Sequence, residues 1–272
     1  MLLYRLAPEG FYAATAPDGR VRILLSDPFE DEPGAWEYGA EADPKGSGLL
    51  APVVPGKVVG IGRNYRDHAA ELGNPMPAEP LVFLKAPSSV IGPGAPVVLP
   101  PESERVELEG EIAAVVRRRL TRASEAEAEA GLLGVTCALD ATARDLQRKD
   151  ATFARAKSFD TFCPLGPAVL VRPDLGALEV VSRLNGDERQ RGRAADMAWG
   201  IAALAAYVSR CMTLEPGDVI LTGTPAGVAP LAGGDVVEVE VPGVGVLRNP
   251  VEAWRAGAGR AGDLAEAAEA TR

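Results

Sequence analysis

The chain has 272 residues, of which 47% are hydrophobic and 24% are charged, the balance of a globular protein with one or two domains. Acidic residues outnumber basic ones by 38 to 28, giving a net charge of −10. This argues against a nucleic-acid binder, which needs a basic surface, and against docking on anionic membranes. No apolar run reaches the about 18 residues of a membrane span, and the first residues lack a secretory-signal pattern. A cytoplasmic protein is therefore expected.

Cysteine and histidine usage limits the kind of metal site that the chain can form. Its three cysteines, Cys137, Cys163 and Cys211, lie far apart and show no C-x-x-C spacing, which indicates reduced thiols rather than a disulfide framework. His68 is the single histidine, so a zinc site built from several imidazoles is excluded. A metal site must use mainly oxygen ligands, which favours Mg²⁺, Mn²⁺ or Ca²⁺.

Residues 1–50 are predicted to form a small β-containing domain. The first half holds two short alternating runs joined by Pro-Asp-Gly, a hairpin-like signal, and the second half is rich in turn residues. A linker over residues 51–56 is expected to lead into the main body, residues 57–252. Residues 253–272 are expected to form a C-terminal tail.

The main body is predicted to be rich in strands, with few helices. Apolar or alternating runs predict strands at 58–62, 81–85, 106–116, 134–140 and 234–251, and Asn-Gly-Asp at 185–187 predicts a hairpin turn. In residues 237–241, valines alternate with glutamates, which indicates a strand with one buried face. Helices are predicted at 124–133, after a capping serine, and at 196–212, where apolar residues form a stripe.

Three carboxylates are candidates for a metal site. Glu109 and Glu111 are two residues apart with a glycine between them, and in a strand such side chains point to the same side, so both can reach one cation. Asp140 ends an apolar run, and three carboxylates with water suit a hard cation. An exposed acidic strand face and, for Asp140, a helix N-cap are the alternative interpretations.

His68 and Glu71 are candidates for acid–base chemistry. They are three residues apart, so on a helical turn the carboxylate can orient the imidazole and raise its basicity; a solvent-facing pair is the alternative. An anionic substrate also needs cations, for which the candidates are Arg144, Lys157 and Lys85. The Gly- and Thr-rich residues 222–227 offer donors to an anion or form an ordinary turn.

Seven segments, taken in order, resemble the fumarylacetoacetate hydrolase family. They are GRNYRDHAAELG, FLKAPSSVIGPG, VELEGEIAAVV, ALDATARDLQ, AKSFDTFCPLGP, LNGDERQ and LEPGDVILTGTPAGV, and they span about Lys57 to Glu252. The resemblance implies a β-rich α+β fold of rolled mixed β-sheets with few helices, behind a small N-terminal β-containing domain. It also implies a homodimer and one Mg²⁺, or in its place Mn²⁺ or Ca²⁺.

The resemblance further implies roles for individual residues. The metal ligands would be Glu109, Glu111 and Asp140. The acid–base pair on a short mobile lid would be His68 and Glu71, and Lys157 would stabilise developing negative charge. The substrate would be held by Arg144 and Gln147 at its oxo groups and by Thr224 at its carboxylate.

The implied activity is metal-dependent chemistry on an enolisable 2-oxo or β-dicarbonyl carboxylic acid in aromatic-compound catabolism. The first expectation is 2-hydroxyhepta-2,4-diene-1,7-dioate isomerase. The alternatives are an acylpyruvate- or fumarylpyruvate-type C–C hydrolase or an oxaloacetate decarboxylase, and the remote alternative is a catalytically inactive metal-binding or interaction protein. The expected partners are a small anionic oxo acid and a second copy of the chain, with no nucleic acid and no membrane.

Overall fold

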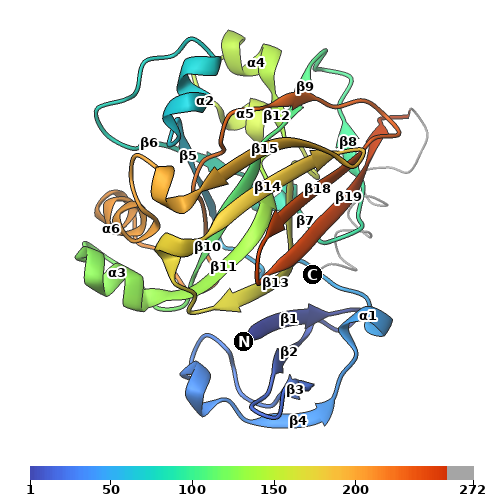
Figure 1. Ribbon diagram of the computed structural model, residues 1–272, viewed down its shortest axis with the longest axis vertical. Coiled ribbons are helices and arrows are strands. Elements are labelled where there is room, and N and C mark those ends of the chain that lie inside the picture. Colours follow the sequence, from blue (N-terminus) through green and yellow to red (C-terminus); the bar gives the residue numbers. More distant parts are fainter. Residues whose placement is uncertain (256–272) are drawn as a thin grey trace.

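The computed structural model describes residues 1–255, which form a mostly β structure with short helices (Figure 1). The first strands are β1 (Leu2–Leu6), β2 (Phe11–Thr15), β3 (Val21–Leu24), β4 (Tyr38–Glu41), β5 (Val58–Gly62), β6 (Leu81–Lys85), β7 (Val90–Ile91), β8 (Val97–Leu99), β9 (Val106–Leu108) and β10 (Gly110–Val116). The later ones are β11 (Leu132–Leu139), β12 (Thr142–Ala143), β13 (Cys163–Val171), β14 (Glu179–Leu184), β15 (Asp187–Arg193), β16 (Val219–Leu221), β17 (Ala229–Pro230), β18 (Val236–Val241) and β19 (Gly245–Ala253). The helices are α1 (Pro44–Ser47), α2 (Arg66–Glu71), α3 (Glu125–Gly131), α4 (Arg144–Lys149), α5 (Ala154–Lys157) and α6 (Ile201–Cys211).

The strands form three sheets, and the largest has eleven strands. Its order is β4-β3-β2-β1-β13-β11-β10-β16-β5-β6, with β7 paired to β13. A five-stranded sheet has the order β15-β14-β18-β19-β8, and a three-stranded sheet has the order β12-β9-β17. Pairing is antiparallel except for β16 with β5, β13 with β7 and β19 with β8. The predicted β-rich fold of mixed sheets with few helices is confirmed.

The N-terminal strands continue the largest sheet. Strand β1 pairs antiparallel with β13, so the predicted small domain projects from the main body along a shared sheet (Figure 1). It holds four strands where the hairpin signal predicts two, because a turn at Gly10, whose φ is +78°, divides the first run into β1 and β2, and the turn-rich second half contributes β4. The proposed division into residues 1–50 and 57–252 stays a prediction, and most of the predicted tail, 256–272, lies outside the described residues.

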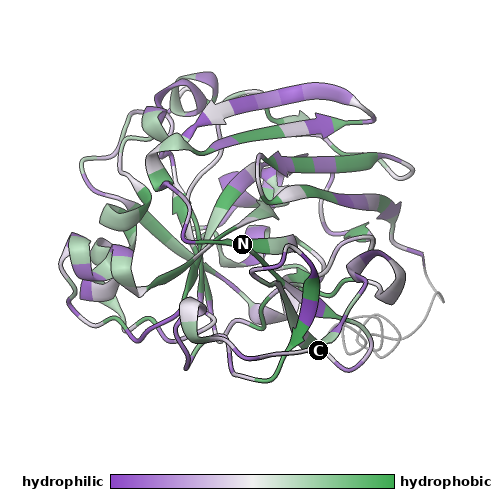
Figure 2. Cartoon of the chain, turned by 60° about the horizontal axis from the view of Figure 1, so that its bottom comes forward, coloured by the Kyte–Doolittle hydropathy of each residue, from purple (hydrophilic) through white to green (hydrophobic). Residues whose placement is uncertain are grey.

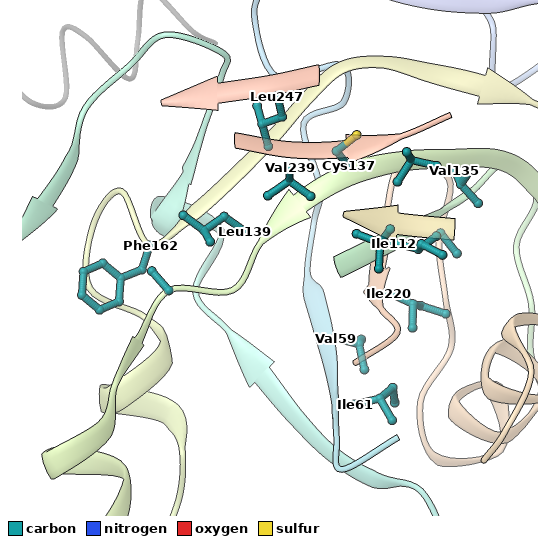
Figure 3. Packing of buried hydrophobic residues seen from close by; sticks show 14 of the residues in the cluster. Val59, Ile61, Ile112, Val135, Cys137, Leu139, Phe162, Ile220, Val239 and Leu247 are labelled. Carbon is teal, nitrogen blue, oxygen red and sulfur yellow. The ribbon is translucent and has the colours of Figure 1, made fainter. Parts of the chain in front are cut away.

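The main core lies between the five-stranded sheet and the largest sheet. Buried side chains from both sheets meet there, including Ile112, Leu139, Val239 and Leu247 (Figure 3). A second cluster, with Leu3 among its members, packs the N-terminal strands against the main body. Hydrophobic residues gather on the central strands, while loops carry more hydrophilic ones (Figure 2). Burying apolar surface contributes about 25 cal/mol of free energy per Å², and this is the main stabilising term for such layers.

Several local predictions are confirmed. Val237, Val239 and Val241 of β18 are buried, while Glu238 and Glu240 are half-buried on the other face. Asn185 and Gly186 both have positive φ and join β14 to β15, as a two-residue hairpin turn requires. Ser124 caps α3 in a reciprocal capping box. Helix α6 begins at Ile201 rather than at residue 196, because residues 194–196 form a separate 3-10 turn.

A search of the described residues, 1–255, finds no helix that is both long and apolar enough to cross a membrane.

Candidate active site

The three candidate metal ligands meet at a break between two strands. Glu109 lies between β9 and β10, where the chain passes from the three-stranded sheet into the largest sheet. Asp140 directly follows β11, which pairs with β10. Carboxylate oxygens of Glu109, Glu111 and Asp140 all lie within 4.8 Å of one another, and all three residues are buried. Gly110 is needed at the crossing, since a Cβ there would lie 2.8 Å from Ser182 Cβ.

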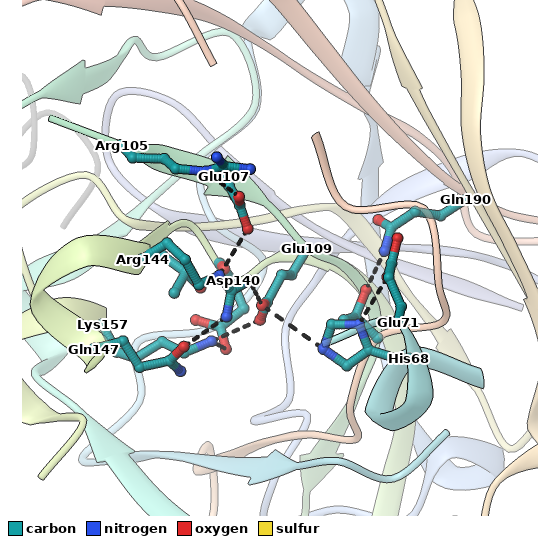
Figure 4. Close-up of polar contacts among 12 residues, drawn as sticks. His68, Glu71, Arg105, Glu107, Glu109, Asp140, Arg144, Gln147, Lys157 and Gln190 are labelled. Atoms are coloured by element: carbon teal, nitrogen blue, oxygen red, sulfur yellow. Dashed lines mark hydrogen bonds and ion pairs between the residues drawn. The ribbon is translucent and has the colours of Figure 1, made fainter. Parts of the chain in front are cut away.

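Two lysines and an arginine neutralise part of this acidic cluster. Lys157 Nζ lies 2.6 Å from both Glu109 Oε2 and Asp140 Oδ2, and Lys85 Nζ lies 2.7 Å from Asp140 Oδ1. Arg144 also contacts Glu109 (Figure 4). The N-cap interpretation of Asp140 is wrong, because its carboxylate binds these lysines and α4 begins only at Arg144.

Glu107 and Gln147 fix the position of Arg144. The Arg144 Nε donates to Glu107 Oε2 at 2.7 Å, and its Nη1 donates to Gln147 Oε1 at 2.6 Å. Glu107 therefore lies outside the carboxylate cluster and binds the Arg144 guanidinium instead. Because Gln147 uses its oxygen to hold Arg144, its amide N–H groups are the part that can reach a substrate oxygen.

The buried charges shift one another's pKa values in opposite directions. Burial alone would raise the pKa of Glu109, but Lys157 and Arg144 outweigh it and hold that pKa well below its usual range. For Glu111, burial and the neighbouring Asp140 charge together raise the pKa well above the usual value. Burial disfavours the charged form of Lys157, yet Asp140 and Glu109 outweigh it and raise the pKa of this ammonium. Lys157 is therefore a permanent cation at neutral pH.

The donor set fits a hard divalent cation. Glu111 accepts a 2.6 Å hydrogen bond from the Gly223 N–H, but its carboxylate forms no ion pair within residues 1–255. A buried carboxylate beside two others is costly unless a cation compensates it. Oxygen-only ligands suit Mg²⁺, Mn²⁺ or Ca²⁺. The residues therefore fit the metal that the sequence resemblance implies.

His68 and Glu71 lie beside the carboxylate cluster on helix α2. His68 Nδ1 is 3.4 Å from Glu71 Oε2, and His68 Nε2 is 4.0 Å from Glu109 Oε1. The imidazole is buried, while Glu71 is about one third exposed. The solvent-facing interpretation of the pair is therefore wrong for His68. The carboxylate on one ring nitrogen leaves the other facing the cluster (Figure 4).

A glycine holds Glu71 in place. The Gly227 N–H donates to both Glu71 oxygens, at 3.0 and 3.1 Å. Gly227 has a φ of +105°, and a Cβ at this position would overlap the Arg189 carbonyl. No other residue fits this backbone without strain. The Gly- and Thr-rich residues 222–227 thus support the acid–base pair as well as the carboxylate cluster.

Gln190 is a site residue to which the sequence analysis gives no role. Its Oε1 accepts from the Gly110 N–H and the Ser182 hydroxyl, both at 2.8 Å, and its Nε2 donates to Thr224 Oγ1 and to the Pro225 carbonyl, both at 2.7 Å. Thr224 in turn donates to the Gly110 carbonyl at 2.9 Å. Gln190 therefore connects Gly110, which lies between Glu109 and Glu111, to the loop that carries Thr224 through hydrogen bonds. A buried glutamine among the exposed charged residues of β15 is the signal that could have revealed it.

The predicted site residues other than Glu71 line one small cavity of about 50 Å³. Its walls are Ile61, Gly62, Arg63, His68, Leu72, Asn74, Phe83, Glu109, Glu111, Asp140, Arg144, Gln147, Phe153, Lys157 and Thr224. This volume is well below the about 300–1,000 Å³ of ordinary ligand pockets, so a substrate requires part of the wall to move. A cavity of about 520 Å³ beside Arg117 and Arg172 is larger but contains none of the clustered carboxylates.

Residues 57–252 match the family "Fumarylacetoacetate (FAA) hydrolase C-terminal". The chain belongs to this family and is an enzyme, since its named relatives are isomerases, tautomerases and a hydrolase. An uncharacterised protein of Archaeoglobus fulgidus is 48% identical over 201 residues, covering 74% of this chain and 80% of the relative. The mitochondrial oxaloacetate tautomerase FAHD2A of Homo sapiens is 42% identical over 216 residues, covering 75% of this chain and 69% of the relative.

Two solved structures of named enzymes share the fold. The 5-carboxymethyl-2-hydroxymuconate delta-isomerase of Mycobacterium smegmatis has a TM-score of 0.84 at 39% identity, covering 93% of this chain and all of the other. The 2-hydroxyhepta-2,4-diene-1,7-dioate isomerase of Mycobacterium marinum has a TM-score of 0.82 at 37% identity, covering 93% and 98%. The predicted family fold is therefore confirmed over nearly the whole chain, N-terminal strands included.

Proposed function

We propose that the protein is a divalent-metal-dependent isomerase that converts 2-hydroxyhepta-2,4-diene-1,7-dioate into its 2-oxo isomer. The observation that carries the proposal is a buried His68–Glu71 pair facing a cluster of three buried carboxylates. The names of the relatives support it, because isomerases and a tautomerase move protons and leave the carbon skeleton intact.

Glu109, Glu111 and Asp140 would hold the metal, for which Mg²⁺ is proposed and Mn²⁺ or Ca²⁺ are the alternatives. When bound, such an ion polarises a carboxylate and the neighbouring oxygen and so favours the enolate. The four buried acids of the site are Glu107, Glu109, Glu111 and Asp140, and its three buried cations are Lys85, Arg144 and Lys157. Their net charge is −1, and a bound divalent ion would change it to +1. The site then attracts an anionic substrate despite the overall charge of the chain.

The proton transfer is assigned to the histidine. His68 accepts the proton of the substrate 2-hydroxyl as the carbonyl forms, and a proton is added at C5 as the double bonds shift. One proton leaves oxygen and one reaches carbon, so atoms and charge balance. Glu71 stabilises the imidazolium between the two events, and the Gly227 N–H keeps Glu71 in position.

The remaining residues bind and orient the substrate. Lys157 is held charged by its carboxylates and stabilises negative charge that develops on the substrate oxygen. Gln147 offers its amide N–H groups, while Arg144 fixes Glu109 and Gln147. Thr224 already donates its proton to Gly110, so binding a substrate carboxylate requires its hydroxyl to rotate. Entry requires displacement of the cavity wall, for which α2 is the proposed lid.

Oxaloacetate tautomerase is the second candidate function. It needs the same transfer of a proton between oxygen and carbon, and the human relative of that name is 42% identical. C–C hydrolysis and decarboxylation each release an enolate when the carbon–carbon bond breaks, and they are the competing outcomes of the test. A small anionic oxo acid as substrate, a homodimer, a cytoplasmic location and the absence of nucleic-acid and membrane partners are proposed together with this function.

The test follows the dienol absorbance with purified protein in Mg²⁺ and again in EDTA. Activity should require the metal and fall by at least about 100-fold in His68→Asn, the usual scale for a lost general base. Calorimetry should show unchanged Mg²⁺ binding in His68→Asn and lost binding in Glu109→Gln. The exposed Glu41→Gln serves as the control. Full activity in EDTA, or in His68→Asn, would contradict the proposal.

A further inference from the structure

Arg63 combines an unusual backbone with a place in the wall of the active-site cavity. Its φ is +57°, in the left-handed region that non-glycine residues rarely adopt. This conformation is strained for a residue with a Cβ, and such residues cluster at functional sites. Arg63 is half-buried and lines the same cavity as His68 and Lys157.

The neighbouring Asn64 keeps this backbone in place. Asn64 is fully buried, and its Nδ2 donates to the Thr222 carbonyl at 2.7 Å and to the Trp199 carbonyl at 3.1 Å. Its Oδ1 accepts from the Trp199 N–H at 3.0 Å. Three hydrogen bonds to two other segments therefore fix the residue that follows Arg63. The fold maintains the strained position where a glycine would sit without strain.

Arg63 is also the cavity-lining cation whose charge is not already used. Arg144 pairs with Glu107 and Glu109, and Lys157 pairs with Glu109 and Asp140. Arg63 has no ion pair with any residue of the described part of the chain. A planar guanidinium is the side chain best suited to binding a carboxylate through two parallel hydrogen bonds.

We infer that Arg63 binds the distal carboxylate of a dicarboxylic substrate, the one farthest from the 2-oxygen. The apolar walls formed by Ile61, Leu72 and Phe83 suit the carbon chain between the two ends. Arg63 is thus a specificity-determining residue, and it sets the preference for dicarboxylates over monocarboxylates. This inference rests on the proposed function, because the other carboxylate is placed at the metal-binding cluster.

The test compares ligands that differ by one carboxylate. Binding of heptanedioate and of heptanoate is measured by calorimetry in Mg²⁺, for the wild type and for Arg63→Gln. The wild type should prefer heptanedioate, and Arg63→Gln should bind it about 10- to 100-fold more weakly, the value of one charged hydrogen-bonded pair. Its affinity for heptanoate should not change. Arg66→Gln, an exposed neighbour on α2, is the matched control and should behave as the wild type.

A second variant separates binding from folding. Arg63→Gly relieves the left-handed backbone, so its melting temperature should stay equal or rise while the preference for heptanedioate disappears. The inference would be overturned if the Arg63 variants lost affinity for both ligands equally, or bound both as the wild type does. It would also be overturned if the wild type bound heptanedioate no more tightly than heptanoate. Since binding needs no turnover, an enzyme that binds heptanedioate through Arg63 but leaves the dienol unchanged would refute the proposed reaction alone.

Discussion

Glu111→Gln should change stability and metal binding in opposite directions. The substitution keeps the size of the side chain and an oxygen that accepts from the Gly223 N–H, but at a pH high enough to ionise Glu111, whose pKa is raised, it removes one buried charge. At 4.8 Å, two unit charges interact by about 3.5 kcal/mol at an effective dielectric constant of about 20. The substitution removes the repulsion of Glu111 by Glu109 and by Asp140, and also its attraction to Lys157. Because two repulsions and one attraction of similar size are lost, the net effect is stabilising.

The metal-free variant should therefore be more stable than the wild type. After relaxation of the site, we expect a gain of about 1–3 kcal/mol in the free energy of unfolding, or a melting temperature higher by roughly 3–10 °C. Mg²⁺ affinity should fall by more than about 100-fold, because loss of a ligand exceeds the 10- to 100-fold effect of residues that only orient ligands.

Thermal unfolding in EDTA and calorimetry with Mg²⁺ measure the two effects separately. Glu41→Gln is the control, since this glutamate forms only an exposed pair with Arg20, which contributes little. A less stable Glu111→Gln protein with unchanged Mg²⁺ affinity would refute the reasoning, since Glu111 would then be neither strained by its neighbours nor a metal ligand.

Three further predictions concern buried groups. Gln190→Leu removes four buried hydrogen bonds and should cost roughly 2–5 kcal/mol of unfolding free energy, measured by denaturant titration; a cost near zero would contradict the role that we assign to Gln190. Burial raises the pKa of Cys137 and of Cys163 to about 12, so both stay protonated and unreactive at pH 8, and a thiol reagent should modify only the exposed Cys211 before denaturation. The raised pKa of Glu111 means that protons compete with the metal, so Mg²⁺ affinity measured by calorimetry should rise with pH; an affinity independent of pH would argue against Glu111 as a ligand.

The sequence predicts much of the site because its signals are local. The i, i+3 spacing of His68 and Glu71 requires only one helical turn, and α2 supplies it. The valine alternation in β18 and the Asn185–Gly186 turn also depend on neighbours in the chain. Such features form wherever the segment is placed, so they can be deduced before the fold is known.

Contacts between distant segments could not be predicted in this way. Gln190 reaches Thr224 across 34 residues, and Gly227 reaches Glu71 across 156, through sheet pairings that no local pattern encodes. The pairing of β1 with β13, which joins the N-terminal strands to the main body, is likewise a contact between distant segments. A positive φ in a non-glycine residue leaves no mark in the sequence, so no local pattern distinguishes Arg63.

The central claim is that the protein moves a proton and keeps the carbon skeleton of its substrate intact. Its most direct test is nuclear magnetic resonance of the reaction with 2-hydroxyhepta-2,4-diene-1,7-dioate in D₂O with Mg²⁺. We predict a seven-carbon 2-oxo product that carries one deuterium at C5, with no reaction in EDTA. Release of a shorter acid or of carbon dioxide, or a product without solvent deuterium, would contradict the account.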